Sequence, residues 1–136
     1  FAFKAKTNDT RESAAIQICK DLLDEGAILN IHDPKVSVDQ IEKDLNLSPY
    51  KSNQKEKEDN LKEGSWNRIE DLKLAFNNAD AVVVLTEWEE YRTINWLEIS
   101  KQMRRPSWVF DVRSIIDPKE VIKNGINFWR IGDGLQ

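Results

Sequence analysis

Apolar residues recur along the chain with two alternating periods, one typical of helices and one typical of strands. The first helical pattern runs through Ile16, Cys19 and Leu23, and we expect Thr10 or Asp9 to cap it and Gly26 to end it. The same spacing predicts further helices, which cover residues 38–45, 66–76, 95–103 and 118–125. In the last of these, Pro118 stands at a favourable first helical position.

Short apolar runs separate these helices and predict strands. They cover residues 1–3, 27–31, 81–85, 108–110 and 126–131. The run 81–85 shows no alternation, which is typical of a central parallel strand covered on both faces, and residues 86–91 are expected to form the loop after it. Strands that alternate with helices predict an α/β fold: a three-layer, Rossmann-like, doubly wound and mainly parallel sheet of five to six strands.

The length of 136 residues suits one domain, and we expect a single domain over residues 1–136. Residues 46–64 are strongly polar and are interpreted as a surface excursion from it. The chain starts without Met, at the apolar end of an expected strand, so we expect a fragment of a longer protein.

The overall charge limits the classes of partner. A net charge of -4 provides no long-range attraction to nucleic acid or to an anionic membrane, so phosphate binding must come from a few local cations. The apolar run 81–85 is too short to cross a bilayer. A single cysteine excludes an internal disulfide and is compatible with a cytoplasmic protein.

Ligands of such sheets bind outside the carboxyl ends of the strands. The residues that follow the predicted strands are Lys4, Asp33, Thr86, Glu87, Trp88, Asp111 and Arg113. Among them, Lys4 and Arg113 are the cations placed to hold a diphosphate, although each is also consistent with a solvated or ion-paired surface charge.

Other chemistries find little support in the sequence. The five glycines form neither GxGxxG nor a Walker pattern, and one His and one Cys give no metal-ligand spacing. Cys19 lies on the apolar side of its helix and is interpreted as a core residue. We therefore expect neither a metal site nor a catalytic residue in this chain.

Four segments resemble motifs of the nucleotide-sugar dehydrogenases (the UDP-glucose/GDP-mannose dehydrogenase family). They are Phe1-Ala2-Phe3-Lys4 with Asp9-Thr10-Arg11-Glu12-Ser13, Ile31-His32-Asp33-Pro34, Thr86-Glu87-Trp88 and Phe110-Asp111-Val112-Arg113. They occur in the family's order across nearly the whole chain. The match is to the carboxyl-terminal, UDP-binding domain and looks most like the UDP-glucose 6-dehydrogenase branch.

The resemblance implies that Phe3, Lys4 and Arg113 bind UDP and that Arg11 reaches toward NAD. Family members oxidise the primary alcohol of a nucleotide sugar to a carboxylate in two NAD-dependent steps, through a thiol-bound intermediate. It implies as partners a UDP-sugar substrate, an amino-terminal NAD domain of the same chain and further copies in a homo-oligomer, with no nucleic acid and no membrane.

The sequence also departs from the family pattern. The thiol nucleophile and its Gly-rich loop belong upstream in the family, so the fragment alone is expected to be inactive. Val112 replaces the usual Gly before Arg113, and a β-branched residue resists positive φ. Alternatives are the same domain of a UDP-N-acetyl-hexosamine or GDP-mannose dehydrogenase, a receiver-like α/β interaction module without enzymatic activity, or an oligomerisation surface.

Overall fold

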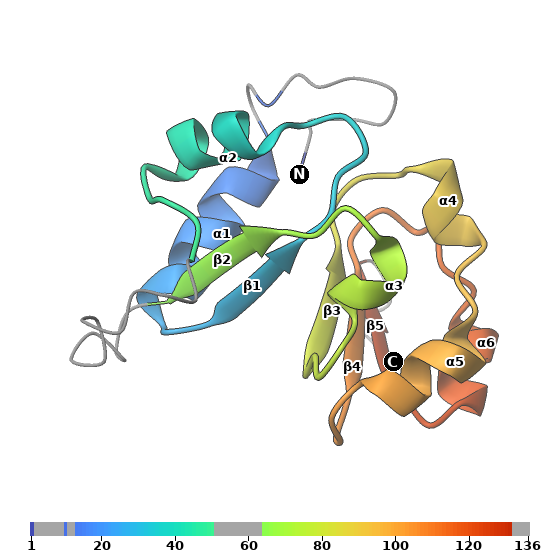
Figure 1. Cartoon of the computed structure of the whole chain (residues 1–136). Helices are drawn as coiled ribbons and strands as arrows, with labels where there is room; N and C mark the ends of the chain where they lie inside the picture. Colours follow the sequence, from blue (N-terminus) through green and yellow to red (C-terminus); the bar gives the residue numbers. More distant parts are fainter. Residues whose placement is uncertain (2–9, 11–12, 51–63, 132–136) are drawn as a thin grey trace. The chain divides into compact units, whose positions relative to one another are not determined.

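The computed structural model describes residues 1, 10, 13–50 and 64–131, in which helices alternate with parallel strands (Figure 1). The chain divides into two compact units, whose described parts run from Phe1 to Asp71 (unit 1) and from Leu72 to Ile131 (unit 2). No helix among the described residues is long and apolar enough to cross a membrane.

Unit 1 consists of two helices and a two-stranded parallel sheet. The helices are α1 (Ala14–Asp24) and α2 (Val38–Leu45), and the strands are β1 (Ile28–Ile31) and β2 (Ser65–Arg68). Ser13, rather than the predicted Thr10 or Asp9, is the N-cap of α1, and its hydroxyl accepts a hydrogen bond from the Ala15 amide. After α1, Gly26 adopts a positive φ of 86°, as expected for a residue that ends a helix.

The predicted helix over residues 66–76 is wrong, because its first part is strand β2. Trp66 pairs with Leu29 in the sheet, is fully buried, and donates from Nε1 to the carbonyl oxygen of Leu47 at 2.8 Å. Only α3 (Leu72–Ala75) is helical in this stretch. The apolar residues Trp66, Ile69 and Phe76 have helical spacing, but β2 ends between the first two of them. The local sequence does not show that residues 65–68 pair with β1.

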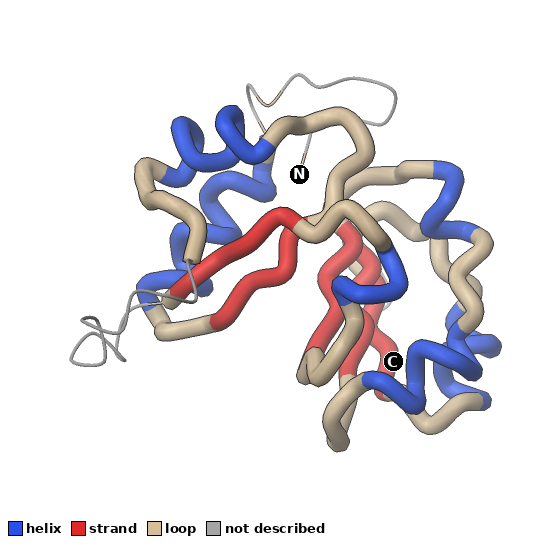
Figure 2. Tube along the Cα trace, in the orientation of Figure 1, coloured by secondary structure: helices blue, strands red, loops and turns tan. Residues whose placement is uncertain are grey.

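Unit 2 is a three-stranded parallel sheet with helices on one of its faces. The strands β3 (Ala81–Val84), β4 (Trp108–Asp111) and β5 (Asn127–Arg130) are hydrogen-bonded in that order. The helices α4 (Glu89–Arg92), α5 (Trp96–Gln102) and α6 (Pro118–Lys123) lie on one side of the strands (Figure 2). Asn95 and Asp117 cap α5 and α6 through their side chains.

The core of unit 2 fills the space between the sheet and these helices. Val109 and Val121 are fully buried there, and Phe76 meets Trp96 edge to face with ring centroids 6.1 Å apart. On the other face, the rings of Trp108 and Phe110 stack with their centroids 5.5 Å apart, and the centroids of Phe110 and Trp129 are 6.2 Å apart. The sheet of unit 2 therefore has one face packed against helices and one face with half-exposed aromatic rings.

The predicted α/β fold with mainly parallel strands is confirmed. Five strands, within the predicted five to six, occur among the described residues, and they form two sheets of two and three strands instead of one. The predicted strand 81–85 exists as β3, which comes first in the order of the described strands of its sheet, and Val83 is 39% exposed rather than covered on both faces. The predicted strand 1–3 lies, except for Phe1, outside the described residues, as do residues 51–63 of the predicted excursion.

Candidate functional site

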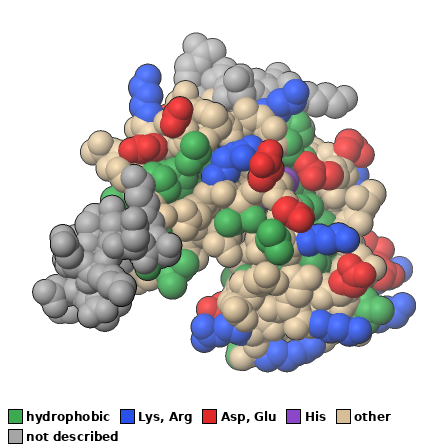
Figure 3. All heavy atoms as spheres, in the orientation of Figure 1, with side chains coloured by type: hydrophobic (Ala, Val, Ile, Leu, Met, Phe, Trp, Pro, Cys, Tyr) green, Lys and Arg blue, Asp and Glu red, His purple; other side chains and the backbone are tan. Residues whose placement is uncertain are grey.

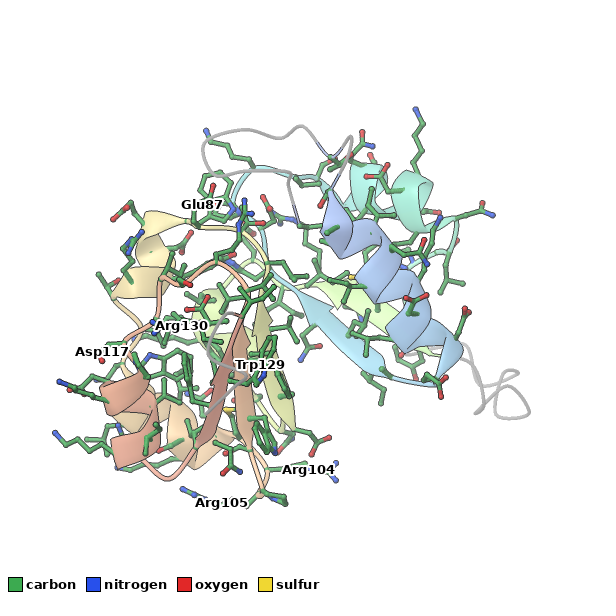
Figure 4. The ribbon with its side chains drawn as sticks, turned by 180° about the vertical axis from the view of Figure 1, so that it is seen from behind. Glu87, Arg104, Arg105, Asp117, Trp129 and Arg130 are labelled. Atoms are coloured by element: carbon green, nitrogen blue, oxygen red, sulfur yellow. The ribbon has the colours of Figure 1, made fainter. Side chains whose placement is uncertain are left out.

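The carboxyl ends of β3 and β4 bring two loops of unit 2 together. Val84 and Asp111 are partners in the parallel register, and the Val112 amide donates to the Val84 carbonyl at 3.1 Å. The chain leaves both strands at the same edge of the sheet, where Figure 4 places Glu87, while Arg104 and Arg105 lie at the opposite end of the unit. This edge is where parallel sheets bind their ligands.

Asp111 determines the shape of the loop after β4. Its side chain is fully buried, Oδ1 accepts from the Arg113 amide at 2.9 Å, and Oδ2 accepts from the amides of Ile115 and Ile116 at 2.8 Å each. Three bonds to one buried carboxylate hold the backbone on both sides of Ser114, which has a φ of 58°. Asp111 is thus a structural residue of the candidate site, and the Arg113 backbone is anchored by it.

Arg113 lies at the surface of this edge and is paired with the neighbouring loop. Its Nε donates to Oε2 of Glu87 at 2.6 Å, and the two side chains are 35% and 34% exposed. The partners are 26 positions apart in the sequence and come from the loops after β4 and β3. A guanidinium anchored in this way is oriented, and about a third of the Arg113 side chain is accessible to solvent.

The residues on either side of Glu87 are buried. Thr86 is 1% exposed, and Trp88 is 7% exposed and belongs to the hydrophobic core of unit 2. Trp88 is also the N-cap residue of α4, so the predicted loop over residues 86–91 ends earlier than expected. The burial of both neighbours fixes the backbone from which Glu87 points.

Val112 does not strain the loop. Among the described residues, positive φ angles occur at Asn46, Asn78 and Ser114 and at two glycines, and Val112 is not one of them. A β-branched residue is therefore compatible with the backbone observed before Arg113.

Asp33 has the same structural role after β1 of unit 1. It is 1% exposed, and its Oδ1 accepts from the amides of Lys35 and Val36 at 2.8 and 2.9 Å. Arg68 braces the same turn by donating from Nε to the Val36 carbonyl and from Nη2 to the Asp33 carbonyl, both at 2.8 Å. Asp33 is therefore engaged in shaping a turn.

Of the four predicted site residues, the structure describes only Arg113, which it places at the expected edge. Phe3, Lys4 and Arg11 lie outside the described residues, so the convergence of Lys4 and Arg113 stays a prediction. The ion pair with Glu87 was not predicted. Opposite charges directly after two strands that the fold makes neighbours are the signal that could have revealed it.

Cys19 is a core residue, as predicted. It is 6% exposed, and burial raises the pKa of its thiol to about 11, which leaves it protonated at neutral pH. No group of three or more potential metal ligands occurs among the residues that the structure describes. Acidic and basic side chains are interspersed on the visible surface of unit 2 near its upper end (Figure 3), so anion binding there depends on individual cations.

Comparison with known proteins places the chain in a family. The UDP binding domain of the UDP-glucose/GDP-mannose dehydrogenase family matches residues 1–118. The chain belongs to this family and corresponds to that domain. It is 36% identical to UDP-glucose 6-dehydrogenase 3 of Oryza sativa subsp. japonica and to UDP-glucose 6-dehydrogenase 1 of Glycine max, each over 142 residues and 99% of this chain.

The chain spans 29% of the length of these curated relatives. Among solved structures, the NDP-N-acetyl-D-galactosaminuronic acid dehydrogenase of Methanosarcina mazei Go1 is similar in fold, with a TM-score of 0.70 and 23% identity. That match covers 96% of this chain and 23% of the other. The similarity supports the dehydrogenase-domain fold of the chain.

Proposed function

We propose that the chain is the nucleotide-binding, carboxyl-terminal domain of an NAD-dependent UDP-glucose 6-dehydrogenase, which converts UDP-glucose to UDP-glucuronate in two oxidation steps. The main support is the placement of Arg113, whose oriented guanidinium lies at the carboxyl edge of the sheet in a chain that matches the family's UDP binding domain. Phe3 and Lys4 are proposed to complete the UDP site.

Arg113 suits a diphosphate for chemical reasons. A guanidinium presents planar, fixed donors that can take two phosphate oxygens at once, and it stays charged at every physiological pH. Its backbone amide is held by the buried Asp111 carboxylate, so little of the loop must be ordered when the ligand binds. Binding energy from the UDP moiety then orients the sugar for reaction elsewhere in the enzyme.

The oxidation itself is assigned to the rest of the enzyme. Cys19 is buried with a raised pKa and does not suit a nucleophile. NAD accepts hydride in this chemistry, but the sequence contains no Gly-rich dinucleotide loop, so this chain does not fit the role of the main NAD site. We assign NAD to another domain, with Arg11 reaching toward it, and expect no NAD reduction by the purified chain supplied with UDP-glucose.

The test is a substitution of Arg113 in the full-length protein. Losing charge-assisted hydrogen bonds to phosphate predicts that Arg113→Ala raises the KM for UDP-glucose about tenfold or more. Arg92→Ala is the matched control, because Arg92 carries the same charge in the same unit but pairs with Glu89 within α4. An unchanged KM in Arg113→Ala would remove this residue from the site.

A nucleotide-sugar panel tests the substrate. Turnover of UDP-glucose by the full-length protein, well above that of UDP-N-acetyl-hexosamines and GDP-mannose, is the expected result. Preference for another sugar would move the protein to a sibling activity of the same family. We also propose a cytoplasmic homo-oligomer, and light scattering with and without UDP measures its assembly separately from ligand binding.

A further inference from the structure

We infer that Glu87 is a positioning residue for ligand binding: it holds the Arg113 guanidinium in the orientation that receives the phosphates. The inference rests on the proposed function, since it deepens the role of Arg113 in the same site. It starts from the ion pair between Oε2 of Glu87 and Nε of Arg113, which joins the loops after β3 and β4.

The two loops are suited to this task because their backbones are fixed independently. Glu87 lies between the buried residues Thr86 and Trp88, and helix α4 begins at Glu89. The Arg113 amide donates to the buried Asp111 carboxylate. The ion pair therefore connects two anchored points, and the long Arg113 side chain between them is held in one orientation.

The nitrogen used in the pair is important. Nε lies next to the aliphatic stem of arginine, whereas the two terminal nitrogens form the outer end of the guanidinium and can take two oxygens of one phosphate. Pairing through Nε is compatible with such end-on binding, and it fixes the plane of the guanidinium. The bond from Nε to Glu87 therefore does not itself occupy the terminal nitrogens of Arg113.

Stability of the fold is a poor explanation for this contact. With about a third of each side chain exposed, an ion pair of this kind contributes little to folding. Orienting an arginine before the ligand arrives has a larger effect on binding, because immobilising one such side chain weakens association about two- to tenfold. The negative charge of the Glu87 carboxylate also repels the phosphates. Its charge therefore lowers the affinity for UDP, whereas its hydrogen-bonding oxygen raises it by orienting Arg113.

This opposition gives a sharp test by calorimetric titration of the full-length protein with UDP. Glu87→Ala removes both charge and acceptor, and we expect it to weaken UDP binding about two- to tenfold. Glu87→Gln keeps an acceptor oxygen without the charge, and we expect it to restore affinity to near that of the wild type. Glu89→Ala is the matched control, because Glu89 is a neighbouring acid that pairs with Arg92 and is expected to leave UDP binding unchanged.

A double-mutant cycle ties the effect to Arg113. If Glu87 acts through Arg113, Glu87→Ala has no further effect on UDP affinity in an Arg113→Ala background. Tighter binding in both Glu87→Ala and Glu87→Gln would show that the carboxylate competes with phosphate and would overturn the inference. An unchanged affinity in Glu87→Ala, with weaker binding in Arg113→Ala, would overturn it while leaving the proposed function in place. Unchanged affinity in Arg113→Ala would instead contradict the proposed function.

Discussion

Replacement of Asp111 by asparagine tests how far one buried carboxylate supports the candidate site. Asp111 is fully buried, and its two oxygens accept from three backbone amides, those of Arg113, Ile115 and Ile116. An asparagine has one oxygen and one NH₂ group. In its better orientation the oxygen faces Ile115 and Ile116, and the NH₂ group then faces the amide of Arg113, donor against donor.

The expected cost follows from these contacts. The substitution loses the hydrogen bond from the Arg113 amide to the carboxylate, weakens the other two bonds and leaves this partly buried amide without its acceptor. We therefore expect the free energy of unfolding to fall by about 2–4 kcal/mol. UDP affinity should fall as well, because the backbone of Arg113 loses its anchor. Urea unfolding followed by tryptophan fluorescence, together with titration with UDP, measures both effects.

Asp117→Asn is the control for this experiment. Asp117 is an exposed N-cap that accepts one bond, from the Lys119 amide at 3.0 Å, and asparagine serves equally well at an N-cap. We expect a change below about 0.5 kcal/mol there. If Asp111→Asn costs no more than this control, the carboxylate does not hold the loop and the reasoning is refuted.

Further predictions concern three residues of unit 1. Iodoacetamide should leave Cys19 unmodified in the folded protein at neutral pH and modify it after unfolding, as peptide mass spectrometry would show. The raised pKa of about 11 also predicts that the free energy of unfolding falls as the pH rises from about 9 toward 11. The reason is that the thiol ionises at lower pH in the unfolded chain than in the folded protein. Gly64→Ala would place a Cβ 2.7 Å from the backbone of Leu23, so thermal unfolding should show a loss of about 1–3 kcal/mol, and none would disprove the close approach. Trp66→Phe should lower the free energy of unfolding in urea by about 1–3 kcal/mol through the lost bond to Leu47 and the lost volume. No loss of stability would contradict both the bond and the burial of this ring.

Local sequence was a good guide wherever the structure depends on neighbours in the chain. The helix over residues 38–45, a helix from about Asn95 and the start at Pro118 were all predicted, because capping and helical spacing are short-range properties. The position of Arg113 was also predicted, since a residue directly after a parallel strand must lie at the carboxyl edge.

Pairing between distant segments required the tertiary structure. Strand β2 was mistaken for a helix, because only its partner β1 makes residues 65–68 extended. Asp33 and Asp111 are acidic residues that follow predicted strands, as ligand-binding residues often are. In the structure, both accept hydrogen bonds from backbone amides of their own loops. The sequence alone determined the α/β class, the family resemblance and the place of Arg113. Only the tertiary structure decided which carboxylates shape the backbone and that Glu87 pairs with Arg113, because these contacts depend on which strands become neighbours.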